Sequence, residues 1–200
     1  MSTQPDTYQR IVDSAKQLMF ASSYADVGVA AICEKAEVKK GSFYHFFHSK
    51  QELTLAVIDD YYAEMKENML NEAFIPSLAP LTRLEKFIEL AIDMQTSLHQ
   101  QTGHILGCPF GNLATELATQ DETIRSKLDK LFTRFQNIIA DTLQEAVDKG
   151  DVESLDVSAS ANAFIAYFEG TLLLAKTHND PQIVRRLLPA AAQIRLKPTH

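Results

Sequence analysis

Apolar residues recur every three or four positions along most of this 200-residue chain, and the alternating pattern of a half-buried strand is essentially missing. Spacings of three and four bring apolar side chains onto one face of an α-helix. The signal is strongest from 124 to 142, where the apolar residues form one long stripe. Because 46% of the residues are hydrophobic and only 22% are charged, the chain has enough apolar surface for a folded core. The sequence therefore predicts an all-α protein.

Three short helices are predicted in the N-terminal quarter of the chain. The first covers about residues 8–19, and the second starts after Gly28 as its N-cap and buries Cys33. A tight turn at residues 37 and 38 leads into a third helix over about residues 39–47. We expect this third helix to be anchored to the first by three aromatic side chains on one side, Phe43, Phe46 and Phe47.

The formal net charge of −7 by itself disfavours a nucleic-acid partner, because neutralising phosphates requires clustered Lys and Arg. The charge is unevenly distributed, however. Residues 1–53 hold six basic and six acidic side chains, so the whole negative excess lies in the rest of the chain. Between Lys39 and Lys50 there are three lysines, two histidines and no acidic residue. The sequence predicts contact with DNA at this local basic strip.

The predicted third helix has a polar side opposite its phenylalanines. At about 100° per residue, this side carries Gly41, Ser42, Tyr44 and His45. Such a helix suits the major groove, since hydrogen-bonding groups can reach base edges and a glycine lets the backbone approach closely. Residues 49–52 then form a capping-box pattern that starts a fourth helix, with Lys50 in its first turn. A helix N-terminus with a lysine is suited to bind a DNA phosphate.

The segment 36–53, AEVKKGSFYHFFHSKQEL, resembles the DNA-binding signature of TetR-type (TetR/AcrR) transcriptional repressors. The resemblance implies a three-helix helix-turn-helix head, a larger helical body that binds an effector and dimerises, and about nine helices in total. It also implies a one-component regulator, most often a repressor, that binds double-stranded operator DNA and is released by a small molecule or electrophile. The DNA-contact residues that it implies are Lys39, Lys40, Ser42 and His45 toward bases or adjacent phosphates, Tyr44 and Lys50 toward the backbone, and Gly41.

One position departs from the pattern of that family. Glu37 stands in the turn before the third helix, where many members carry Gly. We expect Glu37 to adopt the turn conformation at a modest energetic cost and its carboxylate to repel a nearby phosphate.

Residues 1–53 are predicted to form the DNA-binding head and residues 54–200 the effector-binding and dimerisation body, with a fourth helix of about residues 50–72 connecting them. We expect this fourth helix to transmit the effector signal by tilting. The last two helices, the apolar one around 163–175 and the one that starts at Pro181, are assigned to a four-helix dimer interface. Further helix ends in the body are predicted at Pro109, at a capping box from Thr119 to Glu122, at Gly150 and at Asp156.

Cys108 precedes the predicted helix that starts at Pro109, so its thiol lies near the positive end of a helix dipole and should ionise more easily. Residues 105–117 and 170–176 resemble the N-ethylmaleimide-responsive branch of the TetR family, in which a cysteine and a lysine, here Cys108 and Lys176, act together as a redox switch. A Gly-Cys-x-x-Gly-Asn pattern also resembles relatives that bind ordinary small ligands. Cys108 is therefore a reactive switch, a contact in a ligand pocket, or inert packing, and Lys176 can equally extend to water at the helix end.

Other function classes lack their motifs in this sequence. There is no Glu-x-x-His pair, no Gly-rich phosphate loop and no nucleophile elbow, so we predict that the chain is not an enzyme and needs no cofactor. With two cysteines and no zinc-ligand spacing, we expect neither a disulfide framework nor a structural metal. Glu116, His99 and His104 are predicted to be solvent-facing or structural.

The location of the protein is predicted from its N-terminus and its most apolar stretch. The N-terminus is polar and lacks the pattern of a secretory signal. The stretch 159–175 is short for a membrane span and is interrupted by Asn162 and Glu169, so we interpret it as a buried helix of a cytoplasmic protein. A rival interpretation keeps the helical body as a ligand-binding or protein-binding module without DNA binding, and a steep salt dependence of binding would separate the two.

Overall fold

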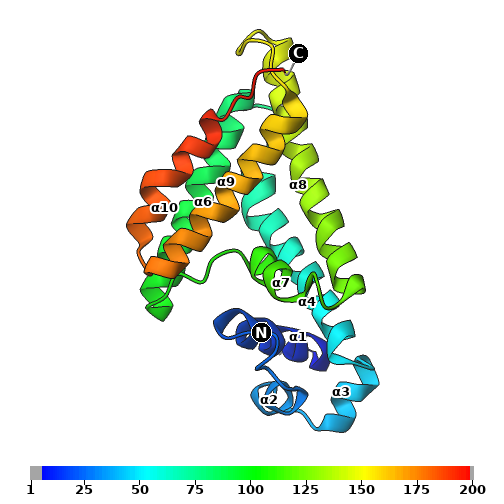
Figure 1. Ribbon diagram of the computed structural model, residues 1–200. Coiled ribbons are helices and arrows are strands. Elements are labelled where there is room, and N and C mark those ends of the chain that lie inside the picture. Colours follow the sequence, from blue (N-terminus) through cyan, green and yellow to red (C-terminus); the bar gives the residue numbers. More distant parts are fainter. Residues whose placement is uncertain (1–5, 199–200) are drawn as a thin grey trace. The chain divides into compact units, whose positions relative to one another are not determined.

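The computed structural model describes residues 6–198, which form helices and connecting loops (Figure 1). α4, a single π-helical turn and α5 follow each other without a break, so the ten α-helical segments among the described residues make nine helices. The predicted all-α fold with about nine helices is confirmed. The elements are α1 (Thr7–Ala21), α2 (Val29–Lys35), α3 (Lys40–Phe46), α4 (Lys50–Met65), the π-helix (Lys66–Leu70), α5 (Asn71–Ala73), α6 (Pro80–Thr102), α7 (Pro109–Leu117), α8 (Glu122–Asp148), α9 (Val157–His178), α10 (Pro181–Leu187) and a 3₁₀-helix (Leu188–Gln193).

The chain divides into two compact units. Of the described residues, the first unit contains those up to Glu64 together with Pro109–Leu128, and the second contains Met65–Cys108 together with those from Asp129 to residue 198. The first unit, which we call the head unit, therefore holds α1–α3, nearly all of α4, α7 and the start of α8. It is larger than the predicted head of residues 1–53, because it also includes α7 and the start of α8. These segments are far from the first 53 residues in sequence.

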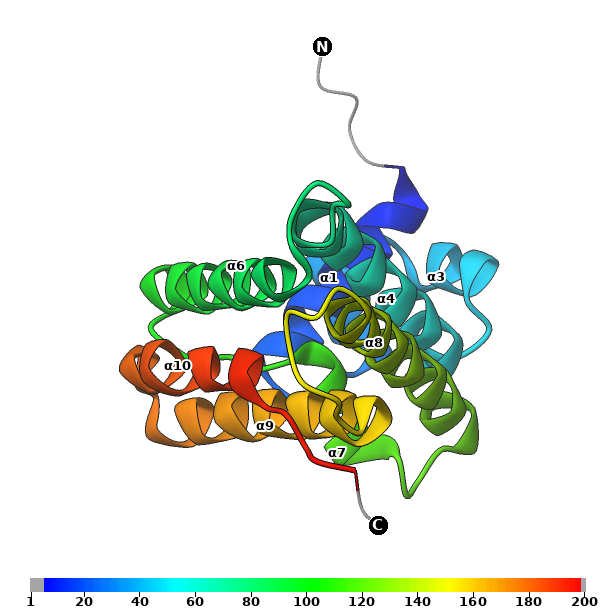
Figure 2. The same ribbon diagram turned by 90° about the horizontal axis from the view of Figure 1, so that it is seen from above.

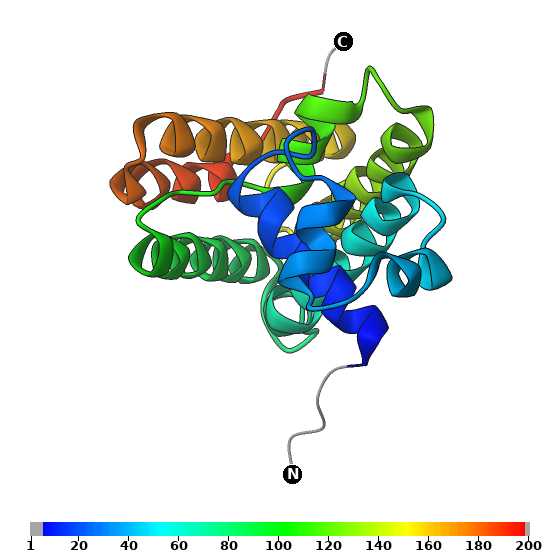
Figure 3. The same ribbon diagram turned by 90° about the horizontal axis from the view of Figure 1, so that it is seen from below.

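The core of the head unit is built by the apolar faces of its first helices. α1, α2 and α3 pack against one another (Figure 3, dark to light blue). Cys33 is only 4% exposed, as the core interpretation predicted. Gly28 caps α2 with an extended backbone, also as predicted. The buried cluster comprises Ile11, Val12, Ala15, Met19, Val27, Ile32, Cys33, Ala36, Phe43, Phe47, Leu53 and Val57.

The three phenylalanines of the α3 segment contact the rest of the head in two ways. Phe43 and Phe47 are four residues apart and buried, whereas Phe46 is 36% exposed and packs with its ring 5.9 Å from that of Tyr8. Residues four apart share a helix face, while Phe46 is rotated by about 100° from Phe47. Phe47 also leaves the helix in an extended conformation, which returns its side chain to the core. The predicted contact of Phe46 with the first helix is therefore present, but it is made at the surface through Tyr8 and not in the buried core.

The second unit is organised around α6 and α9. α10 and the 3₁₀-helix lie against both of these helices (Figure 2). Phe87 of α6 stacks on Phe168 of α9 with ring centroids 5.7 Å apart. Arg83 at the start of α6 donates to both carboxylate oxygens of Glu145 on α8 at 2.6 and 3.2 Å. These contacts join three helices that are distant in sequence into one core.

Most of the predicted helix ends are confirmed. Pro109 begins α7, Gly150 follows α8 with a left-handed backbone at φ 77°, and Asp156 caps α9. The predicted capping box from Thr119 to Glu122 is wrong, because Asp121 accepts the hydrogen bond from the Ile124 amide at 3.0 Å. α8 begins at Glu122, so the residue directly before it occupies the N-cap position.

α9 is an apolar helix, and the other elements of the chain bury only part of its surface. By length and composition it is the one helix among the described residues that could cross a membrane, but only 28% of its most apolar window is buried. Leu173 and Leu174 are 61% and 48% exposed. Within one chain the helix is therefore buried on one side only, and the prediction that its other side meets a partner chain stays a prediction.

Candidate nucleic-acid interface

The exposed side of α3 carries the polar residues that the sequence predicted for it. Lys39 is the N-cap in an extended conformation, and the helix runs from Lys40 to Phe46. Its other side is fixed by Phe43, which is fully buried. The predicted DNA-contact residues on this helix are exposed, with Ser42 half-buried: Lys39, Lys40, Gly41, Ser42, Tyr44 and His45. The helix thus presents one continuous face with two cations, two aromatic polar groups and a hydroxyl.

Gly41 leaves open space on that face. A Cβ atom added at this position would meet no other atom within 4 Å, and the backbone of Gly41 is ordinary right-handed helix. Neither packing nor backbone conformation therefore requires glycine here. Glycine inside a helix costs about 1 kcal/mol relative to Ala. The glycine leaves open space beside the backbone of α3.

The two aromatic polar residues are held by neighbouring rings. Tyr44 is 52% exposed, and its ring lies edge-on to Phe43 at 5.2 Å. The His45 ring lies edge-on to Phe46 at 4.9 Å. Packing of this kind limits the freedom of exposed side chains before a ligand arrives. The hydroxyl of Tyr44 and the imidazole of His45 are therefore presented by rings in defined positions.

Lys50 differs from the other predicted contact residues. Its ammonium group donates to the carbonyl oxygen of Tyr24 and lies 3.8 Å from the centroid of the Tyr24 ring. Burial lowers the pKa of Lys50, although the nearby carboxylates of Glu116 and Asp26 raise it in part. A phosphate contact by Lys50 stays a prediction, and it requires the ammonium group to leave Tyr24.

Glu116 on α7 binds the loop between α1 and α2. Its carboxylate accepts the backbone N–H groups of Tyr24 at 2.9 Å and Ala25 at 2.7 Å. A second contact joins Gln51 of α4 to Asp121 at 2.6 Å. The sequence predicted Glu116 to be solvent-facing or structural, and the structural alternative is confirmed. No local pattern marked this role, because 92 residues separate Glu116 from Tyr24.

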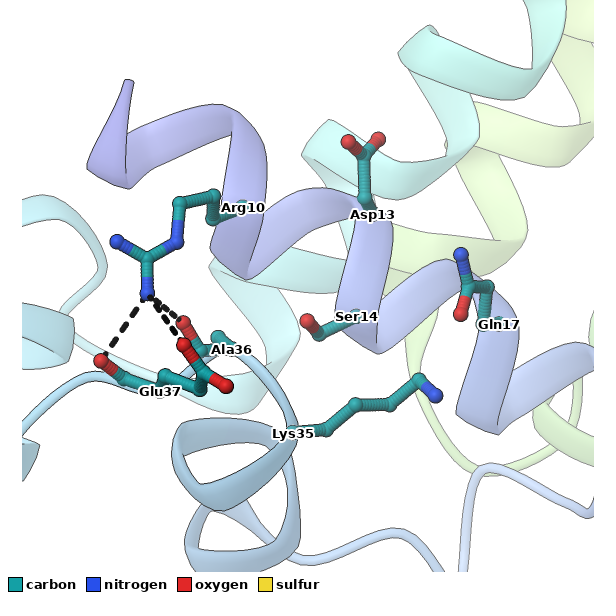
Figure 4. Close-up of a pocket in the computed structure, with 7 residues that line it drawn as sticks. All are labelled: Arg10, Asp13, Ser14, Gln17, Lys35, Ala36 and Glu37. Carbon is teal, nitrogen blue, oxygen red and sulfur yellow. Dashed lines mark hydrogen bonds and ion pairs between the residues drawn. The ribbon is translucent and has the colours of Figure 1, made fainter. Parts of the chain in front are cut away.

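The turn between α2 and α3 is held by Arg10 of α1. Glu37 adopts a left-handed backbone with φ 53°. The Arg10 guanidinium donates to the carbonyl oxygens of Ala36 and Glu37, the latter at 3.1 Å, and lies 3.9 Å from the Glu37 carboxylate (Figure 4). The sequence identified Glu37 as unusual but did not indicate Arg10. The hollow at this corner is about 250 Å³ and is lined by Arg10, Asp13, Ser14, Gln17, Lys35, Ala36 and Glu37.

The two predicted switch residues of the second unit lie in different environments. Cys108 is half-buried directly before α7, and its thiol is hydrogen-bonded to the carboxyl group of Glu169 on α9. Burial raises the pKa of Glu169, and the bond with Cys108 lowers it in part. Lys176 is exposed two helical turns beyond Glu169. The contact that the structure gives to the thiol is therefore with an acid that the sequence did not single out.

Gln95 of α6 contacts the loop that leads to Cys108. Its side chain is fully buried, and its amide nitrogen donates to the carbonyl oxygen of Gly107 at 3.1 Å. The other amide atom, Oε1, has no hydrogen-bond partner among residues 6–198. A buried acceptor without a donor is costly, so it marks a place where a ligand or water can bind.

Comparison with known proteins identifies both parts of the chain. Residues 11–57 match the family described as bacterial regulatory proteins, tetR family, and residues 80–191 match the family described as tetracyclin repressor-like, C-terminal domain. An uncharacterised HTH-type transcriptional regulator in the lacX 3′ region of Lactococcus lactis subsp. lactis is 32% identical over 90% of this chain and 88% of its own length.

Two further similarities concern the fold and the branch within the family. The crystal structure of regulatory protein TetR from Rhodobacter sphaeroides superimposes with a TM-score of 0.83 at 30% identity, covering 95% of this chain and 99% of that one. The HTH-type transcriptional repressor NemR of Escherichia coli (strain K12) is 31% identical over 64% of this chain and 62% of its own length. NemR is thus one of several distant relatives, and its similarity does not assign the chain to a branch.

Proposed function

The chain is a member of the TetR family of bacterial transcriptional regulators, and on this premise we propose that it is a one-component repressor that binds operator DNA as a homodimer and leaves it when an effector acts on the second unit. Members of this family regulate transcription through DNA binding and are not enzymes, so the predictions of a DNA-binding regulator and of a non-enzyme are confirmed. The cytoplasm is the location that such a protein requires, because its operator is there.

The observation that carries the proposal is the exposed face of α3. Lys39 and Lys40 at its N-terminal end supply positive charge for phosphates, and the helix N-terminus adds to it. Tyr44 and His45 offer a hydroxyl and an imidazole to base edges or to the backbone. Phosphate contacts position the helix in the major groove, while base contacts read the sequence.

We assign the dimer interface to α9 and α10. The uncovered face of α9 combines small and large apolar side chains three or four residues apart: Ala166, Gly170, Leu173 and Leu174. A self-complementary apolar face of this kind suits a twofold axis, where the same patch of two copies meets. A dimer would place two copies of α3 in successive major grooves, about 34 Å apart, and so bind a palindromic operator.

We place the effector site beside Cys108 in the second unit. Gln95 Oε1 offers an unused acceptor to an N–H or O–H group of a ligand, and Glu169 adds a half-buried carboxyl group bonded to the thiol. Both a covalent switch at Cys108, with Lys176 as a second participant, and a noncovalent ligand are compatible with this cluster. The Glu169 carboxylate opposes thiolate formation, whereas the start of α7 favours it.

The signal has a short route along the chain. Pro109, the residue after Cys108, begins α7, and Glu116 near the end of α7 holds the loop between α1 and α2. A displacement of α7 would therefore move that loop, alongside the tilt of α4 that the sequence suggested. A coupling of about 1–3 kcal/mol is enough for a useful switch.

The test compares DNA release by three proteins on a DNA site selected by the wild type from a random pool. Wild type, Cys108→Ser and the control Cys33→Ser are measured by fluorescence anisotropy before and after treatment with an aromatic disulfide reagent, and again after dithiothreitol. If Cys108 is the switch, wild type and Cys33→Ser release DNA reversibly while Cys108→Ser stays bound. If wild type and Cys108→Ser respond alike, the thiol switch is wrong and the effector is a noncovalent ligand.

A further inference from the structure

The turn before α3 contains a backbone conformation that its residue does not favour. Among the described residues other than glycines, only Glu37 and Asn179 have positive φ, at 53° and 50°. Asparagine visits this left-handed region readily, but glutamate does not. Glu37 lies two residues before Lys39, the N-cap of the helix that faces DNA. Any relaxation of this turn would therefore change the direction in which α3 starts.

Arg10 is placed to hold this turn. Ala36 is the C-cap of α2, and carbonyl groups at a helix C-terminus lack intrahelical partners and carry partial negative charge. The guanidinium of Arg10 donates to the carbonyl oxygens of both Ala36 and Glu37 (Figure 4). One planar group on α1 thus binds the end of α2 and the strained residue at the same time.

Arg10 also faces the charge that Glu37 brings to this corner. The Glu37 side chain is 88% exposed, and its carboxylate lies 3.9 Å from the Arg10 guanidinium, whose side chain is 33% exposed. Without that cation, an exposed negative charge would stand next to the two lysines at the start of α3. Lys39 and Lys40 would then attract a phosphate less strongly.

We propose that Arg10 is a positioning residue for DNA recognition: it holds the left-handed turn at Glu37, and so the direction of α3, and it neutralises the carboxylate beside Lys39 and Lys40. This inference rests on the proposed use of α3 for DNA contact. The hydrogen bonds of Arg10 are made within the chain, so its removal should weaken DNA binding without removing a phosphate contact.

A double-mutant cycle tests the proposal. The four proteins are wild type, Arg10→Gln, Glu37→Gly and the double variant, with Lys39→Ala as a reference for a lost phosphate contact. DNA affinity is measured at several salt concentrations, well below each melting temperature. Arg10→Gln should weaken binding by about tenfold, the cost of leaving the left-handed turn unsupported. It should leave the salt dependence of the affinity unchanged, whereas Lys39→Ala should reduce the log–log slope by about 0.9.

The decisive comparison is the effect of Arg10→Gln in the Glu37→Gly protein and in the wild type. Glycine adopts the left-handed turn without strain and carries no carboxylate, so Arg10→Gln should cost less than about twofold in the Glu37→Gly protein. Glu37→Gly alone should bind DNA at least as well as the wild type. If Arg10→Gln does not fold, the Glu37→Gly variant alone carries the test, and weaker DNA binding by Glu37→Gly would overturn the proposal.

Three other results would also overturn the role of Arg10. An equal loss in both backgrounds, or a slope reduced as in Lys39→Ala, would mean that Arg10 contacts DNA itself. A lower melting temperature with unchanged affinity would make Arg10 a stabilising residue only. By contrast, an unchanged affinity of Lys39→Ala and of Lys39→Ala/Lys40→Ala would contradict the proposed DNA surface, and not the Arg10 contacts alone.

Discussion

α3 and α9 each bury one side in their own unit and leave the other side uncovered, yet the uncovered sides are chemically opposite. On α3 the buried side is anchored by Phe43 and the exposed side is basic and polar. On α9 the buried side includes Phe164 and Leu172, while Leu173 and Leu174 are exposed. Uncovered surface alone therefore says little about function. The chemistry of each surface is the basis for proposing a phosphate-rich partner for α3 and a second copy of the chain for α9.

The largest effect on DNA affinity is expected from a change on the uncovered apolar side of α9. Leu173→Asp places a charge in the proposed dimer interface, where burying an unpaired carboxylate is costly. We expect sedimentation velocity to show a monomer, and DNA affinity to fall by about a hundredfold or more because two linked heads bind more tightly than one. Ile75→Asp is the matched control, since Ile75 is 38% exposed but outside α9. A variant that remains dimeric would remove α9 from the interface.

The next effect concerns the charge of α3. Lys39→Ala/Lys40→Ala should leave the dimer intact and lower the slope of log affinity against log salt by about 2, because each lost phosphate contact accounts for about 0.9. Lys66→Ala, an exposed lysine in the π-helix, should not change the slope. An unchanged slope in the double variant would mean that phosphates are bound elsewhere.

A smaller effect is expected at the exposed glycines, and at Gly41 it should raise stability while it weakens DNA binding. Gly41→Ala should raise the free energy of unfolding by about 1 kcal/mol, because helix propensity improves and the added Cβ meets nothing within 4 Å. The same methyl group should weaken DNA binding by about tenfold, if DNA approaches the backbone there. Gly170→Ala on α9 should instead affect dimerisation. Unchanged DNA affinity of Gly41→Ala would show that the space is not used.

The smallest effect lies inside the second unit. Glu169→Gln removes the carboxyl group next to the Cys108 thiol, and the ionised form of this group opposes ionisation of the thiol, so alkylation of Cys108 by iodoacetamide at pH 7 should become about threefold faster or more. Mass spectrometry of the modified peptide follows the rate, and buried Cys33 serves as the internal reference. A slower reaction would mean that Glu169 assists the thiol as a base instead of restraining it.

The sequence predicted what depends on local spacing. Residues four apart share a helix face, so the buried pair Phe43 and Phe47 and the polar side of α3 followed from periodicity. The position of Phe46 did not, because the helix ends there and Phe47 turns back to the core. The choice of Asp121 over Thr119 as the cap of α8 depended on the starting residue of the helix, which the run of three polar residues at 119–121 left open.

Long-range contacts were beyond a single sequence. Glu37 was recognised as unusual, but nothing in the spacing connected it with Arg10, which lies 27 residues earlier. Lys50 was expected at phosphate because of its place at a helix start, whereas the folded chain offers it the carbonyl oxygen of Tyr24. The contacts of Glu116 and Glu169 could not be predicted for the same reason, since their partners lie on other elements.

The central claim is that α3 binds DNA and α9 binds a second copy of the chain. Its most direct test is sedimentation of the protein with a DNA site selected by the wild type from a random pool. We predict two copies of the wild type on one site, with affinity that falls steeply as salt rises. Lys39→Ala/Lys40→Ala should sediment as a free dimer, and Leu173→Asp as a free monomer. A complex that retains wild-type affinity in either variant would contradict the assignment of α3 to DNA or of α9 to the dimer.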